Sequence, residues 1–484
     1  MNYFPSIKKN IALNTAYQMF NLFFPFVTAP YLSRVLGADG IGIYSFTNSI
    51  ATFFTMFATI GIWVYGTREI ARVRDNKVEL SRLFWEIEIT IIAFTTASVL
   101  IWLIWIFYAP DYNIIYLILT ITLFNTIADI SWFFAGIEQF KYIILRNSLV
   151  KIAGIVFIFV LIKEKSDLAL FVFLMASTTL IGSICMWIYI PQIIQKTDWK
   201  TIHLKKHFKE SFIYFIPALA TSTYTIFNKI LLNILGGDIR ENGYYEQATK
   251  IILMAQTLTY VALNNVMTSR LSYLFMGNKK EEIQDRIDKS LHYILFMGMG
   301  MTFGLIAISP TFIPWFFGSE FADAIPIMQL FCPLIFISSI SNCLDYHYYT
   351  PAGLKKKCAK YLVAGAIVNI ISNLMLTPQL GAKGTVASFL LTESTITMLF
   401  LRNCNGYMNV SQIIRNGWKK FLAAATMLII MFVWQKNATY LNKSFLVVTT
   451  IIAGVTTYVI VLLLLKDWFM LNISKLTSNI IRHK

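Results

Sequence analysis

Lys229 and Lys250 are lone basic residues inside otherwise apolar segments. Lys229 lies seven residues before a polar stretch that begins at Gly236, and Lys250 lies about six residues after that stretch ends. If both segments are helices, the two lysines lie at the same depth, roughly 10 Å from the polar stretch. This cationic pair could bind an anionic group, with Arg34 at the end of another apolar segment as a third cation. Each lysine could instead extend its ammonium to lipid headgroups, and Arg34 could simply anchor a helix end.

Three acidic residues are candidates for ion coupling. Glu393 lies in the middle of an apolar segment, and Asp129 and Asp345 lie near the ends of two others. Acidic side chains are rare within membrane spans, where they bind protons or cations or pair with a basic residue. Glu393 could equally pack against another helix in its protonated form, and the two aspartates could be hydrated.

Four further basic residues, Arg68, Arg72, Arg146 and Lys151, are expected at the inner mouth of the first half of the protein. They could capture an anionic headgroup as it arrives from the inner membrane surface. They also contribute to the membrane topology, and they could pair with acids close to them in sequence, such as Glu69.

The composition places most of the chain in a membrane. Of 484 residues, 57% are hydrophobic and only 14% are charged, and the mean hydropathy is +0.61. Apolar runs of about 20 residues can cross roughly 30 Å of hydrocarbon as helices, whereas barrel strands would alternate in polarity. We therefore expect an all-α polytopic protein. Fourteen transmembrane helices are predicted over residues 11–34, 41–65, 84–108, 112–134, 147–163, 167–190, 211–235, 244–269, 291–317, 324–349, 361–377, 384–401, 421–435 and 444–465.

Lysines and arginines are distributed unequally between the two sides of this arrangement. The side that holds both termini carries 32 of the 41, the opposite loops carry seven, and Lys229 and Lys250 lie inside spans. The positive-inside rule therefore predicts that both termini are cytoplasmic. The net charge of +16 reflects this topology, and because the basic residues occupy separate short loops, no nucleic-acid partner is expected. Anionic membrane lipids are the partners that such loops fit.

The sequence predicts no cofactor and no metal site. Its five cysteines lie singly, without metal-ligand spacing or a disulfide framework. No P-loop motif occurs, so ATP hydrolysis by this chain is not expected. The first apolar run is too long for a cleaved signal peptide and is interpreted as a retained span.

The stretch "RVLGADGIGIY" (34–44) has a counterpart in "NILGGDIRENGYY" (233–245). Each follows the first helix of a six-helix set, which favours two parallel six-helix repeats around a central cavity. A glycine-terminated turn at both places is the simpler explanation. The positions that align with Lys229 and Lys250 are Pro30 and Ser49, so the lysine pair belongs to the second repeat alone.

The repeats predict four parts along the chain. These are an N-terminal lobe (1–190), a cytoplasmic linker (191–210), a C-terminal lobe (211–402), and two additional spans with a cytoplasmic tail (403–484). Apolar residues among lysines predict that the linker forms an amphipathic helix on the inner membrane surface. These residues are Ile194, Trp199, Ile202, Leu204 and Phe208.

Two predicted cytoplasmic segments, "YGTREIARVRDNK" (65–77) and "WFFAGIEQFKYIILRNSLVKI" (132–152), resemble the Wzx-type flippases. These flippases form part of the polysaccharide transporter family of the multidrug/oligosaccharidyl-lipid/polysaccharide (MOP) exporter superfamily. The resemblance continues through "WFFGSEF" (315–321), "GAIVNIISNLML" (365–376) and "GAKGTVASFLLTE" (381–393), so it covers the first twelve spans.

The resemblance implies a fold similar to that of the multidrug and toxin extruders (MATE). It implies translocation of an undecaprenyl-diphosphate-linked oligosaccharide, an O-antigen or capsule repeat unit, across a bacterial plasma membrane by alternating access. Polysaccharide polymerase and chain-length proteins are the implied protein partners. Aromatic side chains could stack on the sugars; candidates are Trp132, Phe133, Tyr224, Tyr244 and Tyr245.

Other functions fit the sequence less well. A peptidoglycan-precursor flippase and a multidrug extruder belong to the same superfamily, although a basic cavity would repel the organic cations that extruders carry. A membrane polysaccharide polymerase would need catalytic groups on a sizeable outer loop. The predicted outer loops are about ten residues or shorter and carry no such constellation.

Overall fold

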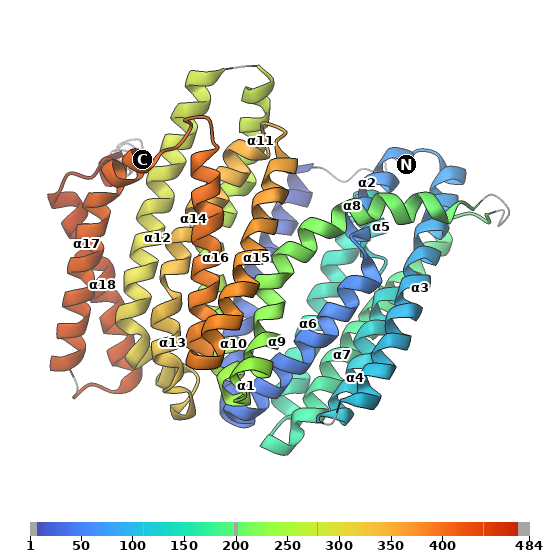
Figure 1. Ribbon diagram of the computed structural model, residues 1–484, viewed down its shortest axis with the longest axis horizontal. Helices are drawn as coiled ribbons and strands as arrows, with labels where there is room; N and C mark the ends of the chain where they lie inside the picture. The colour runs from blue at the N-terminus through green and yellow to red at the C-terminus, as the bar shows by residue number, and fades with distance from the viewer. Residues whose placement is uncertain (1–6, 110, 198–201, 278, 439, 473–484) are drawn as a thin grey trace. The chain divides into compact units, whose positions relative to one another are not determined.

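The computed structural model describes residues 7–109, 111–197, 202–277, 279–438 and 440–472, and the secondary structure of these residues is entirely helical (Figure 1). A helix or a run of helices covers each of the fourteen predicted spans. Among the described residues, eleven helical segments are long and apolar enough to cross a membrane. The protein is therefore a multi-pass α-helical membrane protein, as the sequence predicts.

The chain forms two compact units. The boundary along the sequence lies between Asn233 and Ile234, within helix α9. In the first unit, α3, α4, α6 and α7 run side by side, and α8 lies across α2 and α3 (Figure 1). Its elements are α1 (Ile7–Thr59), α2 (Ile62–Val73), α3 (Lys77–Tyr108), α4 (Asn113–Ala128), α5 (Ser131–Gly136), α6 (Phe140–Leu161), η1 (Lys165–Asp167), α7 (Leu168–Met186), η2 (Trp187–Gln192), α8 (Leu204–Ser222), η4 (Thr223–Phe227) and the start of α9 (Asn228–Gly236).

In the second unit, α17 and α18 form a pair that packs against the long helix α12. The π-helical turns η5 and η7 interrupt two of its spans, as η4 does in the first unit. The elements of the second unit are α10 (Ile239–Gln256), η5 (Thr257–Val261), α11 (Ala262–Met276), α12 (Lys280–Phe316), η6 (Ser319–Phe321), α13 (Ala324–Phe331), α14 (Pro333–Leu344), η7 (Asp345–Tyr349), α15 (Lys355–Leu380), α16 (Ala382–Arg402), α17 (Val410–Asn437) and α18 (Lys443–Leu464).

The two glycine-containing stretches that suggested a repeat have related conformations. In the first, the loop expected between two spans is reduced to a kink within α1 at Gly37, where φ is 70° and ψ is −178°. In the second, Gly237 has φ 76°, and Asp238 caps α10 by accepting a hydrogen bond from the Arg240 amide at 2.8 Å. Both breaks need a glycine because a positive φ is strained for other residues. The left-handed glycine of the second stretch aligns with Ala38, so the match is not residue by residue.

The two segments that most resemble the Wzx-type flippases pack against each other. They contain most of α2 and α5, which share a buried core with α3, and the second segment continues into α6. A Cβ at Gly66 would lie 2.7 Å from the Trp132 ring, and one at Gly136 would lie 2.6 Å from Ile70 Cγ2. The Thr67 hydroxyl also donates to the Trp132 carbonyl at 3.2 Å. The glycines of both segments therefore allow two short helices to touch at backbone distance.

A second helix pair, α15 and α16, contains two of the other resembling segments. The helices pack closely at Gly365, where a Cβ would lie 2.5 Å from Ile396 Cδ1. Asn369 donates to the Thr392 hydroxyl at 3.1 Å between them. At the turn, Gly381 adopts φ 55°, and Glu241 of α10 accepts a hydrogen bond from the Ala382 amide at 2.6 Å. Glu241 thus caps the first turn of α16.

The structure describes only part of the predicted linker (191–210). Residues 198–201, which include Trp199, lie outside the described residues. Leu204 and Phe208 lie in the first part of α8, which begins at Leu204 and continues to Ser222 within the predicted seventh span. Within the first unit, α8 packs closely on the turn before α2. A Cβ at Gly61 would lie 2.9 Å from backbone atoms of Ser211 and Phe215. The four predicted parts of the chain stay a prediction.

Candidate functional site

The three residues predicted for a central cavity lie on three different helices. Lys229 is half-buried at the second position of α9, directly after the π-helical turn η4, a distortion frequent at functional sites. Lys250 is half-buried on α10, with its Nζ 3.5 Å from Oε1 of Glu246. Arg34 is exposed on α1, three residues before the Gly37 kink. Arg34 and Lys229 belong to the first unit and Lys250 to the second, and a cavity shared by all three stays a prediction.

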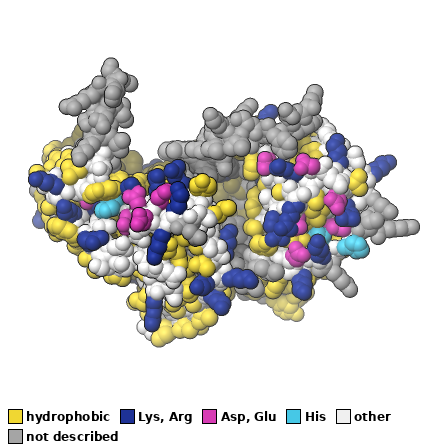
Figure 2. Space-filling model, turned by 90° about the horizontal axis from the view of Figure 1, so that it is seen from above, with side chains coloured by type: hydrophobic (Ala, Val, Ile, Leu, Met, Phe, Trp, Pro, Cys, Tyr) yellow, Lys and Arg dark blue, Asp and Glu magenta, His cyan; other side chains and the backbone are white. Residues whose placement is uncertain are grey.

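Arg68 and Arg72 share one carboxylate at the end of the first unit. Arg68 Nη2 lies 2.7 Å and Arg72 Nη1 lies 2.9 Å from Oε1 of Glu69. Arg68 also donates to the Tyr214 hydroxyl of α8. The side chains of Arg68 and Arg72 are 41% and 63% exposed, so part of each guanidinium faces water. Figure 2 shows lysine and arginine side chains interspersed with acidic ones on this face of each unit.

Arg146 and Asp129, for which the sequence suggested unrelated roles, form an ion pair. Arg146 Nη1 lies 3.0 Å from Asp129 Oδ1 and donates to the Ser183 hydroxyl at 2.9 Å. The Ser131 amide donates to the same aspartate oxygen at 3.1 Å. These contacts join the end of α4 to α6 and α7, so both charged groups have a structural role.

Lys151 lies in the middle of helix α6, and its place at the inner mouth stays a prediction. Helix α6 begins at Phe140, seven residues before the predicted span, because it continues beyond the apolar run. Lys151 is therefore eleven residues from one end of the helix and ten from the other. Its half-buried side chain lines a pocket of about 220 Å³ together with Asn147, Thr178 and Thr179.

The two remaining acids contact neighbouring polar groups in the second unit, where Glu393 is buried and Asp345 is half-buried. Glu393 on α16 is 7% exposed and accepts a hydrogen bond from the Ser341 hydroxyl of α14. Asp345 begins the π-helical turn η7 and accepts hydrogen bonds from Thr350 Oγ1 at 3.2 Å and Cys358 Sγ at 3.4 Å. Glu393 is thus the more deeply buried of the two, and the Ser341 hydroxyl donates the hydrogen bond that it accepts.

Sequence analysis overlooked Glu88 on α3. Its side chain is fully buried, and neither carboxyl oxygen has a hydrogen-bond partner among the described residues. The sequence did contain a signal, because Glu86 and Glu88 interrupt the apolar run that starts at residue 84. Glu86 differs from Glu88 in having partners: His207 Nε2 lies 2.7 Å away, and the Tyr65 hydroxyl lies 2.7 Å from Nδ1 of the same histidine.

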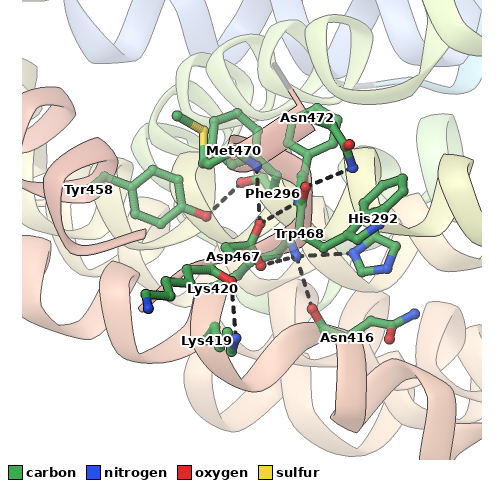
Figure 3. A network of polar contacts seen from close by, with 12 residues as sticks. His292, Phe296, Asn416, Lys419, Lys420, Tyr458, Asp467, Trp468, Met470 and Asn472 are labelled. Carbon is green, nitrogen blue, oxygen red and sulfur yellow. Dashed lines mark hydrogen bonds and ion pairs between the residues drawn. The ribbon is translucent and has the colours of Figure 1, made fainter. Parts of the chain in front are cut away.

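A buried ion pair in the second unit was also overlooked. Lys420 is fully buried on α17, and its Nζ lies 2.7 Å from Asp467 Oδ2, after the end of α18 (Figure 3). The same Nζ donates to the Asn416 carbonyl at 3.0 Å and lies 3.3 Å from Nδ1 of His292 on α12. Lys420 lies just before the predicted span 421–435, which is why it was not counted as a membrane lysine.

A comparison with protein families decides what kind of protein this is. A family model described as "Polysaccharide biosynthesis protein" matches residues 7–275, which is more than half of the 484-residue chain. The chain belongs to this family. The match includes both segments that resemble the Wzx-type flippases, so this polysaccharide biosynthesis protein carries them within the matched region.

Two proteins named as O-antigen transporters are similar to this family member along nearly their whole length. One, from Shigella dysenteriae, is 27% identical over 406 residues, which cover 82% of this chain and 99% of the relative. The other, from Escherichia coli (strain K12), is 26% identical over 415 residues, which cover 82% of this chain and 97% of the relative.

Solved structures show the same fold at low sequence identity. The lipid II flippase MurJ in an inward closed conformation superposes with a TM-score of 0.71 at 16% identity, covering 95% of this chain and 99% of MurJ. An inward-facing multidrug resistance MATE family transporter of the MOP superfamily gives 0.58 at 13% identity, covering 82% and 96%. The predicted MOP-type transporter fold of this polysaccharide biosynthesis protein is confirmed.

The aromatic side chains suggested for sugar stacking are core residues of this family member. Trp132, Phe133 and Tyr245 are 2%, 0% and 1% exposed. Tyr224 and Tyr244 are buried as well. The suggestion is wrong for this structure, because an aromatic ring must present one face to a sugar in order to stack on it.

Proposed function

We propose that this protein is a flippase that moves an undecaprenyl-diphosphate-linked oligosaccharide from the cytoplasmic to the outer leaflet of a bacterial plasma membrane. The observation that carries the proposal is that Lys151, Lys229 and Lys250 are half-buried on helices of a transporter fold. The two relatives named as O-antigen transporters support a surface glycan as the cargo.

The lysines address the main energetic cost of the reaction. One charge at the bilayer centre costs at least about 3 kcal/mol by insertion scales, and a diphosphate carries more than one. Ammonium groups at membrane depth offset this cost through charge-assisted hydrogen bonds. Lys250 lies near Glu246 and would exchange that partner for the diphosphate, while Lys229 and Arg34 contribute from the first unit.

At the inner surface, Arg68 and Arg72 make the first contact with the diphosphate. Each guanidinium has five N–H donors and uses only part of them on Glu69 and Tyr214. Arg146 supports this region through its bonds to Asp129 and Ser183.

In this proposal both termini lie in the cytoplasm. A polysaccharide polymerase with its chain-length proteins uses the product at the outer surface.

Alternating access of the two lobes needs a driving force, which we assign to ion coupling through Glu393. A buried carboxyl with one hydroxyl donor, Ser341, can exchange a proton or a cation when the lobe opens. Asp345 is the second candidate, and Asp129 is the third although it is paired with Arg146 in this conformation.

Leaflet exchange in proteoliposomes tests the proposal. Undecaprenyl-diphosphate oligosaccharide with a fluorescent sugar is quenched from outside by a reductant, and the protected fraction is followed over time. Wild-type protein should exchange this lipid, and Lys229→Ala/Lys250→Ala should slow exchange by at least about tenfold, which corresponds to only about 1.4 kcal/mol of lost stabilisation. Lys443→Ala, an exposed lysine at the start of α18, is the matched control.

The same assay distinguishes the related functions. The fold similarity to MurJ makes the peptidoglycan precursor the second substrate to test, and a cationic dye represents the multidrug extruders. Faster exchange of either compound than of the oligosaccharide lipid would contradict the proposed substrate. Unchanged exchange in the double variant would contradict the lysine assignment.

A further inference from the structure

A small polar pocket lies within the first unit, where α1, α4 and α7 contact one another. Its volume is about 120 Å³. At about 10–15 Å³ for each water-sized group, the pocket has room for roughly ten such groups, which is close to the size of one sugar ring. The polar residues that line it are Tyr44, Asn48, Thr122, Asn125 and Thr179.

Asn125 of α4 brings an unused hydrogen-bond acceptor to this pocket. Its Oδ1 is buried and has no hydrogen-bond partner among the residues that the structure describes. A buried acceptor without a donor costs free energy, because it has given up its bond to water. The Thr179 hydroxyl donates to the Met175 carbonyl at 2.8 Å, so its oxygen still has acceptor capacity. The pocket therefore suits a ligand that carries hydrogen-bond donors.

The pocket has no charge with which to hold an ion. Its lining residues, all of them described, include no acid, lysine, arginine or histidine. A diphosphate would lose its hydration there without gaining a counter-charge. The remaining walls are apolar, from residues such as Leu119 and Val172, and Tyr44 adds an aromatic ring that contacts Phe171 edge-on, with 5.0 Å between ring centroids. Such walls, interspersed with amides and hydroxyls, fit the C–H and O–H groups of a sugar.

Helix α4 indicates that the pocket does not open toward lipid. Leu117 and Phe124 are apolar residues on one side of the helix and are 56% and 49% exposed. Leu119 and Thr122, which line the pocket, lie on the opposite side, because successive helical residues are rotated by about 100°. Polar groups in a membrane span are expected to face protein or a water-filled space. The apolar side of α4 therefore faces hydrocarbon, and the pocket side faces away from it.

We propose that this pocket is a sugar subsite, which binds one uncharged sugar ring of the transported molecule. Asn125 Oδ1 accepts a hydrogen bond from the sugar, Asn48 and Thr122 supply further polar contacts, and Tyr44 packs against the ring. The proposed cargo has an apolar tail, a diphosphate and a glycan, and the glycan alone combines hydroxyl donors with the absence of charge. The proposal rests on the proposed flippase function and deepens it by naming the class of sugar that the first unit recognises.

The affinities of three lipids test the sugar subsite. The probes are undecaprenyl diphosphate, its glucose conjugate and its glucuronate conjugate, and native mass spectrometry of the full-length protein in detergent measures the fraction bound. The glucose conjugate should bind at least about tenfold more tightly than undecaprenyl diphosphate, because the pocket adds hydrogen bonds to the sugar. The glucuronate conjugate should lose most of this gain, because no cation in the pocket receives its carboxylate.

Two variants remove polar groups from the pocket. Asn125→Leu and Thr122→Val should each weaken binding of the glucose conjugate about fivefold and leave the affinity for undecaprenyl diphosphate unchanged. The unchanged affinity for the sugar-free lipid also verifies that both variants are folded. The matched controls are Asn113→Leu at the start of α4 and Thr96→Val on α3, both at exposed positions, which should bind all three lipids as the wild type does.

The sugar subsite is wrong if the wild type binds the glucose conjugate no more tightly than undecaprenyl diphosphate, or if both pocket variants keep the full gain. Tighter binding of the glucuronate conjugate would contradict an uncharged ligand. Leaflet exchange separates these failures from that of the proposed function. If the wild type exchanges the oligosaccharide lipid and Asn125→Leu/Thr122→Val does so equally fast, the subsite falls and the flippase stands. If the wild type exchanges no lipid-linked diphosphate, both fall.

Discussion

Asp129 at the end of α4 and Arg146 on α6 form an ion pair with 3.0 Å between Oδ1 and Nη1. The arginine also donates to Ser183 of α7, so three membrane helices meet at one guanidinium. The side chains are 33% and 13% exposed, which places the pair at the margin of the core. Its contribution to stability can be separated from any role in transport.

A double-mutant cycle measures this pair. Asp129→Ala leaves Arg146 without its counter-ion, and Arg146→Ala leaves the aspartate, so each should lower the melting temperature in detergent. The double variant should lose less than the sum of the singles, with a coupling of about 1–2 kcal/mol. Additive losses would mean that the two charges do not stabilise each other.

Glycine substitutions test the packing of α2 on α5. Gly66→Ala and Gly136→Ala each place a Cβ within 2.7 Å of a neighbouring side chain, and overpacking of this kind costs about 1–3 kcal/mol. Gly154→Ala is the control, because its Cβ would lie 3.8 Å from Met175 Sδ and would favour the helix. We expect lower melting temperatures for the first two variants only. Equal melting temperatures for all three would show that the Trp132 and Ile70 side chains adjust freely.

Lys420→Met should be among the most destabilising substitutions in the second unit. It leaves the Asp467 carboxylate buried without its ammonium partner, and breaking a buried pair costs about 3–5 kcal/mol. Lys420→Met/Asp467→Asn should recover part of the loss, because the amide oxygen can still accept from the Phe469 amide that Asp467 binds at 3.0 Å. Urea or thermal unfolding followed by tryptophan fluorescence measures both. A double variant less stable than Lys420→Met would refute the ion-pair explanation.

Glu241 predicts a pH-dependent stability at the turn between α15 and α16. Burial raises the pKa of this carboxyl above its usual value of 4.5, and the Ala382 amide only partly offsets this effect. A raised pKa in the folded state gives stability that is present below pH 4.5 and is lost as the pH rises through the folded pKa. Glu241→Gln retains an acceptor for Ala382 and removes the charge. Its melting temperature should therefore rise relative to that of the wild type as the pH increases from 4 to 7.

The control for this effect is Glu241→Ala, which removes the cap of α16. It should be less stable than Glu241→Gln at every pH by about 1 kcal/mol. A difference between wild type and Glu241→Gln that does not change with pH would rule out the titration of Glu241 as its cause.

Glu393→Gln tests ion coupling. If Glu393 exchanges a proton during transport, the glutamine variant should lose the acceleration of leaflet exchange by an imposed pH gradient while it still binds the lipid. Ser341→Ala, which removes the donor to Glu393, should shift the pH dependence and retain the acceleration. Glu88→Gln makes the same change at the fully buried carboxyl of the first unit. A pH-gradient response in Glu393→Gln that equals wild type would remove Glu393 from the coupling mechanism.

The sequence predicted the helical spans well because length and apolarity are local properties. It placed the ends less well: α6 begins at Phe140 and α17 at Val410, both well before the apolar runs predicted there. Polar residues can continue a helix beyond the hydrocarbon region, since the backbone hydrogen bonds remain satisfied and Lys and Arg side chains reach water. The earlier start of α6 places Lys151 in the middle of this helix.

The roles of individual charged residues were harder to predict. Glu393 was recognised as buried because it stands alone in an apolar run, but Glu88 and Lys420 lie near the edges of such runs and were missed. The partner of Arg146 is 17 residues away, and that of Lys420 is 47 residues away. No sequence pattern indicates such pairs, because they depend on which helix faces are in contact.

By itself, the sequence determined that this protein is a helical membrane protein with a strongly asymmetric charge distribution, and its short segments indicated the exporter superfamily. These properties follow from composition and from the cost of moving charges into hydrocarbon, which act on each segment separately. Only the tertiary structure decided that Arg146 pairs with Asp129, that Lys420 pairs with Asp467, and that Lys151 lines a pocket with Thr178 and Thr179. Those relationships are set by close packing of helices that are distant in the sequence.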